Sequence, residues 1–291
     1  MGFIDAHVHV WTDDTAHYPL AAGWKKEDMK PQRFTPEDLF KHTKAAGVDR
    51  VNLIQMSYYY PKDLSISKGD GFDNRYMLDM IALYPDVFVG TAVIDVHAEE
   101  PDRLMGELAK KKVRAFRIHP SLSKQPPAKW LEPAGYEKMF AAGAKNNQAM
   151  SCLIAPDALP ELERMCKKYP DTPVIIDHLC RIGLNGTIAD KDVDALCAMA
   201  RHERVIIKVG AFYALGKKEA PYTDLGPLIR KVVTGFGAKR CMWESDCPFQ
   251  VSDGHKYQDS IDLVRKRLDF LSDEDREWLL WRTAEGFFFK K

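Results

Sequence analysis

The sequence has no stretch that approaches the roughly 18 consecutive apolar residues needed by a membrane-spanning helix. Its first segment, MGFIDAHVHV, lacks the basic residues and the long apolar run of a secretory signal peptide. The 42 basic and 42 acidic residues cancel, and no segment concentrates the Lys and Arg of a nucleic-acid-binding surface. We therefore expect a cytoplasmic protein that binds neither membranes nor nucleic acid.

The six cysteines include no CxxC pair and are too sparse for a disulfide scaffold. We expect them to be reduced thiols packed in the core. No Pro-, Gly- or Ser-rich linker divides the chain, and 45% of its residues are hydrophobic, which excludes disorder. We therefore expect residues 1–291 to form one domain, and a homo-oligomer remains an open alternative.

Short apolar runs alternate along the chain with longer amphipathic segments, which is typical of βα units around a parallel sheet. The runs are continuous rather than alternating, as expected of parallel strands covered on both faces. Eight of them are predicted strands: 2–5, 51–55, 88–93, 115–118, 150–154, 174–176, 205–209 and 240–243.

A helix is predicted after each strand. The first begins with a Thr35 N-cap and Pro36 at the first helical position, and it ends at Gly47. The others are expected at 74–84, 101–111, 136–145, 158–168, 190–201, 225–233, 257–270 and 272–285. Eight such units predict a single (β/α)8 TIM barrel, with a doubly wound open sheet as the alternative.

Chemistry in such a barrel is located where the strands end. The first strand leads directly into Asp5-Ala6-His7-Val8-His9. Side chains two residues apart on an extended strand point to the same face, so the imidazoles of His7 and His9 can converge on one ion or one substrate.

Other polar side chains follow the later strands. His178 follows the sixth strand and Asp246 the eighth, so both are expected to enter the mouth that contains His7 and His9. Three imidazoles and a carboxylate can bind a divalent metal, or activate a water molecule without one. Arg117 and His119 end the fourth strand, where they could clamp a substrate carboxylate and polarise a carbonyl.

Further residues are candidates for the rim of the pocket. Ser57, Arg181 and Tyr213 follow the second, sixth and seventh strands. The segments 12–33, 58–72 and 121–133 are long enough to form much of the pocket wall.

Five segments carry a resemblance to a known family: DAHVHVW, FDNRYML, RIHP, IIDHLCR and WESDCPF. They resemble the amidohydrolase-related TIM-barrel family, and within it the branch of 2-pyrone-4,6-dicarboxylate lactonases and sugar lactonases. The resemblance extends over essentially the whole chain. It implies a barrel that hydrolyses lactones or amides, while sister branches decarboxylate or hydrate small acids.

The resemblance also implies roles for individual residues. Asp246 matches the general base, His178 the histidine of the sixth strand, and His7 and His9 the metal-binding pair. Asn74 resembles a residue of the lactonase pocket, although its position after Asp73 equally suits a helix N-terminus.

Two departures from the family pattern concern metal. The fifth strand lacks the histidine of many metal-dependent members, and no lysine ends the fourth strand, so a site for two metals is not expected. We expect either one divalent ion, with zinc as the first candidate, held by His7, His9 and Asp246, or no metal ion. Glu244 stands where relatives often have glycine, and its orientation is open.

Together these features predict a hydrolase that uses a water molecule activated by Asp246 to open a small, anionic lactone or related cyclic ester. A decarboxylase or hydratase of a small aromatic or unsaturated acid is the alternative. A barrel that binds a ligand without catalysis is the third possibility.

Overall fold

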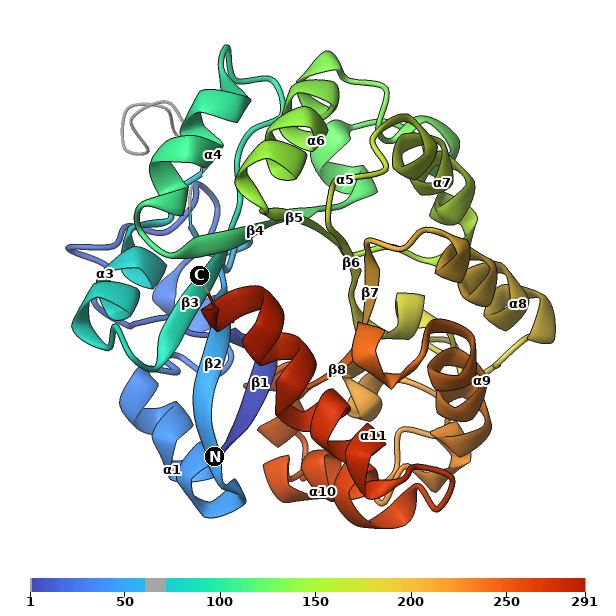
Figure 1. Ribbon diagram of the computed structural model, residues 1–291. Helices are drawn as coiled ribbons and strands as arrows, with labels where there is room; N and C mark the ends of the chain where they lie inside the picture. Colours follow the sequence, from blue (N-terminus) through green and yellow to red (C-terminus); the bar gives the residue numbers. More distant parts are fainter. Residues whose placement is uncertain (1, 61–71, 291) are drawn as a thin grey trace.

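The computed structural model describes residues 2–60 and 72–290. Eight parallel strands form one sheet in the order β1 to β8, and helices surround it (Figure 1). The strands are β1 Phe3–His9, β2 Val48–Ile54, β3 Phe88–Ala92, β4 Val113–Ile118, β5 Ala149–Cys152, β6 Val174–Ile176, β7 Val205–Gly210 and β8 Cys241–Glu244.

The sheet closes between its first and last strands. The His9 backbone N–H donates to the carbonyl of Cys247 at 2.7 Å, and the Asp246 N–H donates to the carbonyl of His7 at 3.0 Å. The predicted (β/α)8 barrel is therefore confirmed, and the alternative of an open sheet is wrong. All eight predicted strands are present, but β1 continues four residues beyond the predicted end and includes both histidines.

The helices are α1 Pro36–Ala46, α3 Arg75–Leu83, α4 Pro101–Ala109, α5 Pro120–Ser123, α6 Ala134–Asn146, α7 Leu159–Lys168, α8 Asp190–Ala198, α9 Gly226–Phe236, α10 Tyr257–Asp262 and α11 Asp273–Glu277. Helix α1 has the expected boundaries, with Gly47 in the left-handed conformation at a φ of 76°. The two predicted C-terminal helices are wrong in part, because α10 and α11 are short and continue into wider π-helical turns. Apolar periodicity does not distinguish these turns from α-helix.

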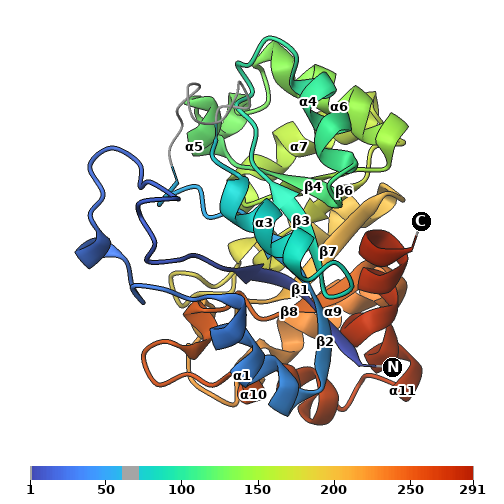
Figure 2. The same cartoon turned by 90° about the vertical axis from the view of Figure 1, so that its left-hand side faces the viewer.

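The C-terminal segment covers one end of the barrel, where Figure 1 shows it lying across the opening. Phe288 is fully buried against interior residues of the barrel such as Ile4, Ala115 and Met242. The Phe287-Phe288-Phe289 run thus closes the amino-terminal end of the barrel, and the opposite end remains for a site. Figure 2 shows both termini at the closed end and the long segment after β1 at the other end.

No helix within residues 2–60 and 72–290 has the length and apolar character to cross a membrane.

Candidate active site

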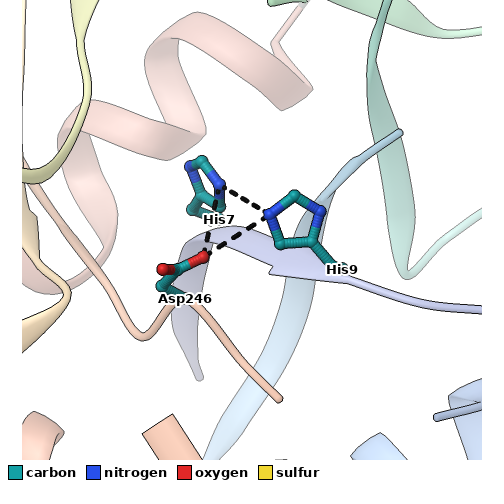
Figure 3. A group of neighbouring side chains, drawn as sticks. All are labelled: His7, His9 and Asp246. Atoms are coloured by element: carbon teal, nitrogen blue, oxygen red, sulfur yellow. Dashed lines mark hydrogen bonds and ion pairs between the residues drawn. The ribbon is translucent and has the colours of Figure 1, made fainter. Parts of the chain in front are cut away.

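Two histidines and an aspartate meet at the mouth of the barrel (Figure 3). The Nε2 atoms of His7 and His9 lie 3.3 Å apart, and Asp246 Oδ1 lies 3.6 Å from the first and 3.5 Å from the second. All three residues are buried. The pairing of β1 with β2 shifts register between Asp5 and Val8, a bulge of the kind that re-aims side chains near active sites.

Strained backbone positions two of the site residues. His178 begins a run of four consecutive residues with φ between 50° and 56°, and Asp246 has a φ of 63°. The left-handed conformation costs a residue other than glycine roughly 1–2 kcal/mol. Such conformations persist where the surrounding structure fixes them and are frequent at functional sites.

Glu244 fixes the orientation of His178 through two hydrogen bonds. Its Oε1 accepts hydrogen bonds from the His178 backbone N–H at 3.0 Å and from Nδ1 at 2.7 Å. Burial alone would lower the pKa of His178, but the charges of Glu244 and Asp246 raise it above its usual value. The open question about Glu244 is thereby answered: it lies under the site, fully buried, at the end of β8.

The two oxygens of Asp246 have different surroundings. Oδ2 accepts a hydrogen bond of 2.7 Å from the hydroxyl of Tyr213, whereas Oδ1 is buried and accepts none from the described part of the chain. Burial alone would raise the pKa of this carboxyl, but the positive charge of His178 and the imidazole of His9 beside it hold that pKa far below its usual range. Asp246 is therefore ionised, and a lone pair on its Oδ1 is available to accept a proton.

Arg117, at the end of β4, brings a positive charge to the histidine pair. Its Nη1 lies 3.2 Å from His9 Nε2 and 3.4 Å from His7 Nε2. The side chain is 7% exposed and faces a cavity of about 260 Å³ at the mouth. The polar wall of this cavity comprises His9, Arg117, His178, Arg181, Tyr213 and Asp246, and the apolar wall includes Met56, Leu153, Leu184, Leu215 and Phe249.

The structure does not bring every predicted residue to the cavity. His119 is turned to Ser121, whose Oγ lies 2.5 Å from His119 Nδ1. Asn74 is buried and bonds both the backbone N–H and the carbonyl of Val93, which ties the start of α3 to the end of β3. Met56 and Tyr58, rather than Ser57 between them, line the cavity. Of the loop 58–72, residues 61–71 lie outside the described part of the chain.

A buried charge cluster beneath the site was not predicted. Lys208 of β7 is fully buried, and its Nζ lies 3.0 Å from Asp177 Oδ1 and 3.0 Å from His7 Nδ1. Ser151 donates to both oxygens of Asp177. The signal in the sequence was a lysine inside the apolar run Val-Ile-Ile-Lys-Val, because a lysine in a buried strand needs a partner.

The donor atoms at the mouth fit one divalent ion. His7, His9 and Asp246 each offer one ligand atom, and these atoms lie within 4.8 Å of one another. Asp246 Oδ1 has no hydrogen-bond partner among the residues that the structure describes. His9 Nδ1 lies 3.1 Å from the Ile54 carbonyl, an outer contact that aims Nε2 at the site. Two imidazoles and a carboxylate are a ligand set that suits zinc.

A closed barrel with two histidines, a further histidine and an ionised aspartate at its mouth is the architecture of a TIM-barrel enzyme that activates water. The family model described as amidohydrolase matches residues 4–290, and the chain belongs to that family.

Two curated relatives are lactone hydrolases. The chain is 26% identical to an L-fucono-1,5-lactonase of Burkholderia ambifaria, over 87% of this chain and 82% of the relative. It is 23% identical to a 4-sulfomuconolactone hydrolase of Rhizobium radiobacter, over 94% and 84% of the two chains.

Solved structures share the fold. A probable 2-pyrone-4,6-dicarboxylic acid hydrolase of Acinetobacter baumannii, with citric acid bound, has a TM-score of 0.76 at 20% identity and 99% coverage of both chains. An amidohydrolase of Burkholderia multivorans, with zinc bound, has a TM-score of 0.77 at 18% identity, again with 99% coverage of both.

Proposed function

We propose that this protein hydrolyses a small anionic lactone, with Asp246 as the general base. The observation that carries the proposal is the buried, ionised Asp246 carboxylate beside a cavity of about 260 Å³, whose Oδ1 accepts no hydrogen bond from residues 2–60 or 72–290. A cavity of this size suits a substrate with one ring. Two curated relatives named as lactone hydrolases support the same reaction class.

The reaction follows from the positions of the side chains. Asp246 Oδ1 removes a proton from water, and the hydroxide formed adds to the carbonyl carbon of the lactone. Arg117 and protonated His178 face the cavity and stabilise the negative charge on the carbonyl oxygen. When the ring C–O bond breaks, the ring oxygen takes the proton from Asp246, and the product is a hydroxy acid. Tyr213, which donates to Oδ2, holds the carboxylate in place.

His7, His9 and Asp246 would hold a metal, for which zinc is the first candidate. A bound divalent ion would supply Lewis-acid polarisation of the carbonyl and a more acidic water. The contribution of the chain is the same with or without it: two imidazoles oriented from β1, a carboxylate fixed by Tyr213, and a cationic wall.

Lactone panels test the proposal. Purified protein is offered neutral sugar lactones and lactones that carry a carboxylate or sulfonate, with and without a chelator, and acid release is followed. The proposal expects turnover of at least one anionic lactone. Release of CO2 from aromatic or unsaturated acids without any lactone turnover would replace it with a decarboxylase. Ligand-induced thermal stabilisation without turnover of either class would indicate a binding protein.

Arg181 accounts for the expected preference for anions. It lines the cavity, and no carboxylate of residues 2–60 or 72–290 forms an ion pair with it. A guanidinium that faces a cavity can bind a substrate carboxylate through two hydrogen bonds. We expect Arg181→Met to raise KM for an anionic lactone about 10–100-fold, the cost of a charged hydrogen bond, while kcat changes little. A neutral lactone serves as the control, because its KM should not change.

The activity should fall at alkaline pH. His178 faces Glu244, Asp246 and the ring of His7, and the net effect of burial and the two carboxylates is a raised pKa. Its positive charge is thus present below that raised pKa and is lost as pH rises through it. Asp246, with a depressed pKa, stays ionised throughout. We expect log(kcat/KM) against pH to show an alkaline limb, and Glu244→Gln to move that limb to lower pH. A limb that Glu244→Gln leaves in place would contradict this assignment.

A further inference from the structure

Lys208 forms one end of a hydrogen-bonded chain that passes through both histidines of the HxH pair. Its Nζ lies 3.0 Å from Asp177 Oδ1 and 3.0 Å from His7 Nδ1, and the side chain is fully buried. A lysine ammonium has three donors and no acceptor. The contact with His7 therefore requires a lone pair on Nδ1, and a neutral His7 then carries its proton on Nε2.

The contacts of His9, at the other end of this hydrogen-bonded chain, lead to the same tautomer of His7. His9 Nδ1 lies 3.1 Å from the carbonyl oxygen of Ile54, which can only accept, so Nδ1 carries the proton and Nε2 has the lone pair. The 3.3 Å contact between the two Nε2 atoms then needs a proton from His7. Arg117 Nη1 lies 3.2 Å from His9 Nε2, which can accept its hydrogen bond, and 3.4 Å from His7 Nε2, so it competes with His9 for the His7 atom.

Glu244 competes with Lys208 for the same atom of His7. Its Oε2 lies 3.0 Å from Nδ1, yet it accepts no hydrogen bond within residues 2–60 and 72–290. If Nδ1 carried the proton and donated to Glu244, Nε2 would have its lone pair directed at His9 and Asp246. That tautomer can bind a metal through Nε2, whereas the tautomer selected by Lys208 cannot.

We propose that Lys208 is a positioning residue that holds His7 in the Nε2–H tautomer and thereby weakens metal binding by His7, His9 and Asp246. Lys208 and Glu244 compete for one nitrogen atom, His7 Nδ1, and their balance sets the metal affinity of the mouth. This inference does not depend on the substrate, because it concerns only the proton on His7.

Nuclear magnetic resonance tests the tautomer in the unmodified protein. Two-bond 1H–15N correlation spectra distinguish Nδ1–H from Nε2–H imidazoles, and the His7 signals are assigned by their loss in His7→Gln. We expect His7 to show the Nε2–H pattern in the metal-free protein. An Nδ1–H pattern would overturn the proposal, and this measurement needs no variant at position 208.

Metal titration of Lys208→Met tests the consequence. Zinc affinity is measured by competition with a chromophoric chelator, and cobalt binding by its visible spectrum. We expect the variant to show Nδ1–H on His7 and to bind zinc roughly 10–100-fold more tightly, the size of effect that outer contacts of metal ligands have. Because Lys208→Met leaves Asp177 without its cation, Lys208→Met with Asp177→Asn is measured as well.

Ser151→Ala is the matched control. It removes the two hydrogen bonds of Ser151 to Asp177 but keeps Lys208 beside His7, so the tautomer and the zinc affinity should not change. Tighter zinc binding in the Lys208 variants with an unchanged tautomer would show simple charge repulsion and overturn the proposal. Unchanged affinity in both Lys208 variants would overturn it too.

Discussion

Asp246→Asn is expected to lower kcat by about 10³–10⁴-fold, because the variant keeps the shape of the side chain but cannot take a proton from water. Asp246 Oδ1 accepts no hydrogen bond from the described residues, and the low pKa of the carboxyl keeps it ionised across the working pH range. The measurement is kcat for the lactone that gives the highest turnover in the panel. A variant that retains more than a tenth of the activity would remove Asp246 from the mechanism.

Loss of fold must be separated from loss of chemistry. Asp246 interacts with the histidine cluster, so the variant should also be less stable, and thermal unfolding gives the temperature range in which it is folded. Asp5→Asn is the matched control. Asp5 accepts hydrogen bonds from the backbone of His7 and Ser245 and from Tyr257, so it supports the same strand ends from outside the cavity. Its loss should lower stability far more than kcat.

The sequence was sufficient to predict the convergence of the HxH pair. The two-residue period of a strand places His7 and His9 on one face, and the rule that barrel chemistry lies at strand ends brings Asp246 and His178 to the same mouth. The bulge in β1 that completes the geometry was not predictable, since it depends on the pairing of β1 with β2. Hydrophobic periodicity reports burial and not register.

The charges beneath the site were not predicted because each partner comes from a different strand. Lys208 belongs to β7, Asp177 directly follows β6, and Glu244 is the last residue of β8. No local sequence pattern indicates that these residues meet. Their burial did leave a local trace, a charged residue within or beside an apolar run. Gly210 shows the same limit: a Cβ there would lie 2.1 Å from the Glu244 carbonyl oxygen and 2.2 Å from its Cγ, so this glycine makes room for a residue 34 positions away.

Arg117→Met is expected to lower kcat about 10²–10³-fold, the usual loss when one stabilising donor of an oxyanion is removed. Arg117 is buried at the mouth, and its Nη1 contacts both Nε2 atoms of the HxH pair. Its Nε has no hydrogen-bond partner in the described ranges 2–60 and 72–290. The guanidinium therefore has donor capacity left for a substrate oxygen. The assay is run with chelator present, so that a metal ion entering beside the histidines cannot replace the lost charge.

Arg117→Lys separates the charge from the geometry of its donors. Lysine retains a positive charge but has no planar fork, so it cannot contact the histidines and the substrate oxygen together. If the planar fork matters, Arg117→Lys should lose most of the activity that Arg117→Met loses. If charge alone matters, Arg117→Lys should retain most of that activity.

The contrast with Arg181→Met is the decisive comparison. Substitution of a residue that stabilises the transition state lowers kcat, whereas substitution of a residue that only binds the substrate raises KM. An Arg117→Met variant with raised KM and normal kcat would move Arg117 to the substrate-binding wall and leave His178 as the cation of the reaction.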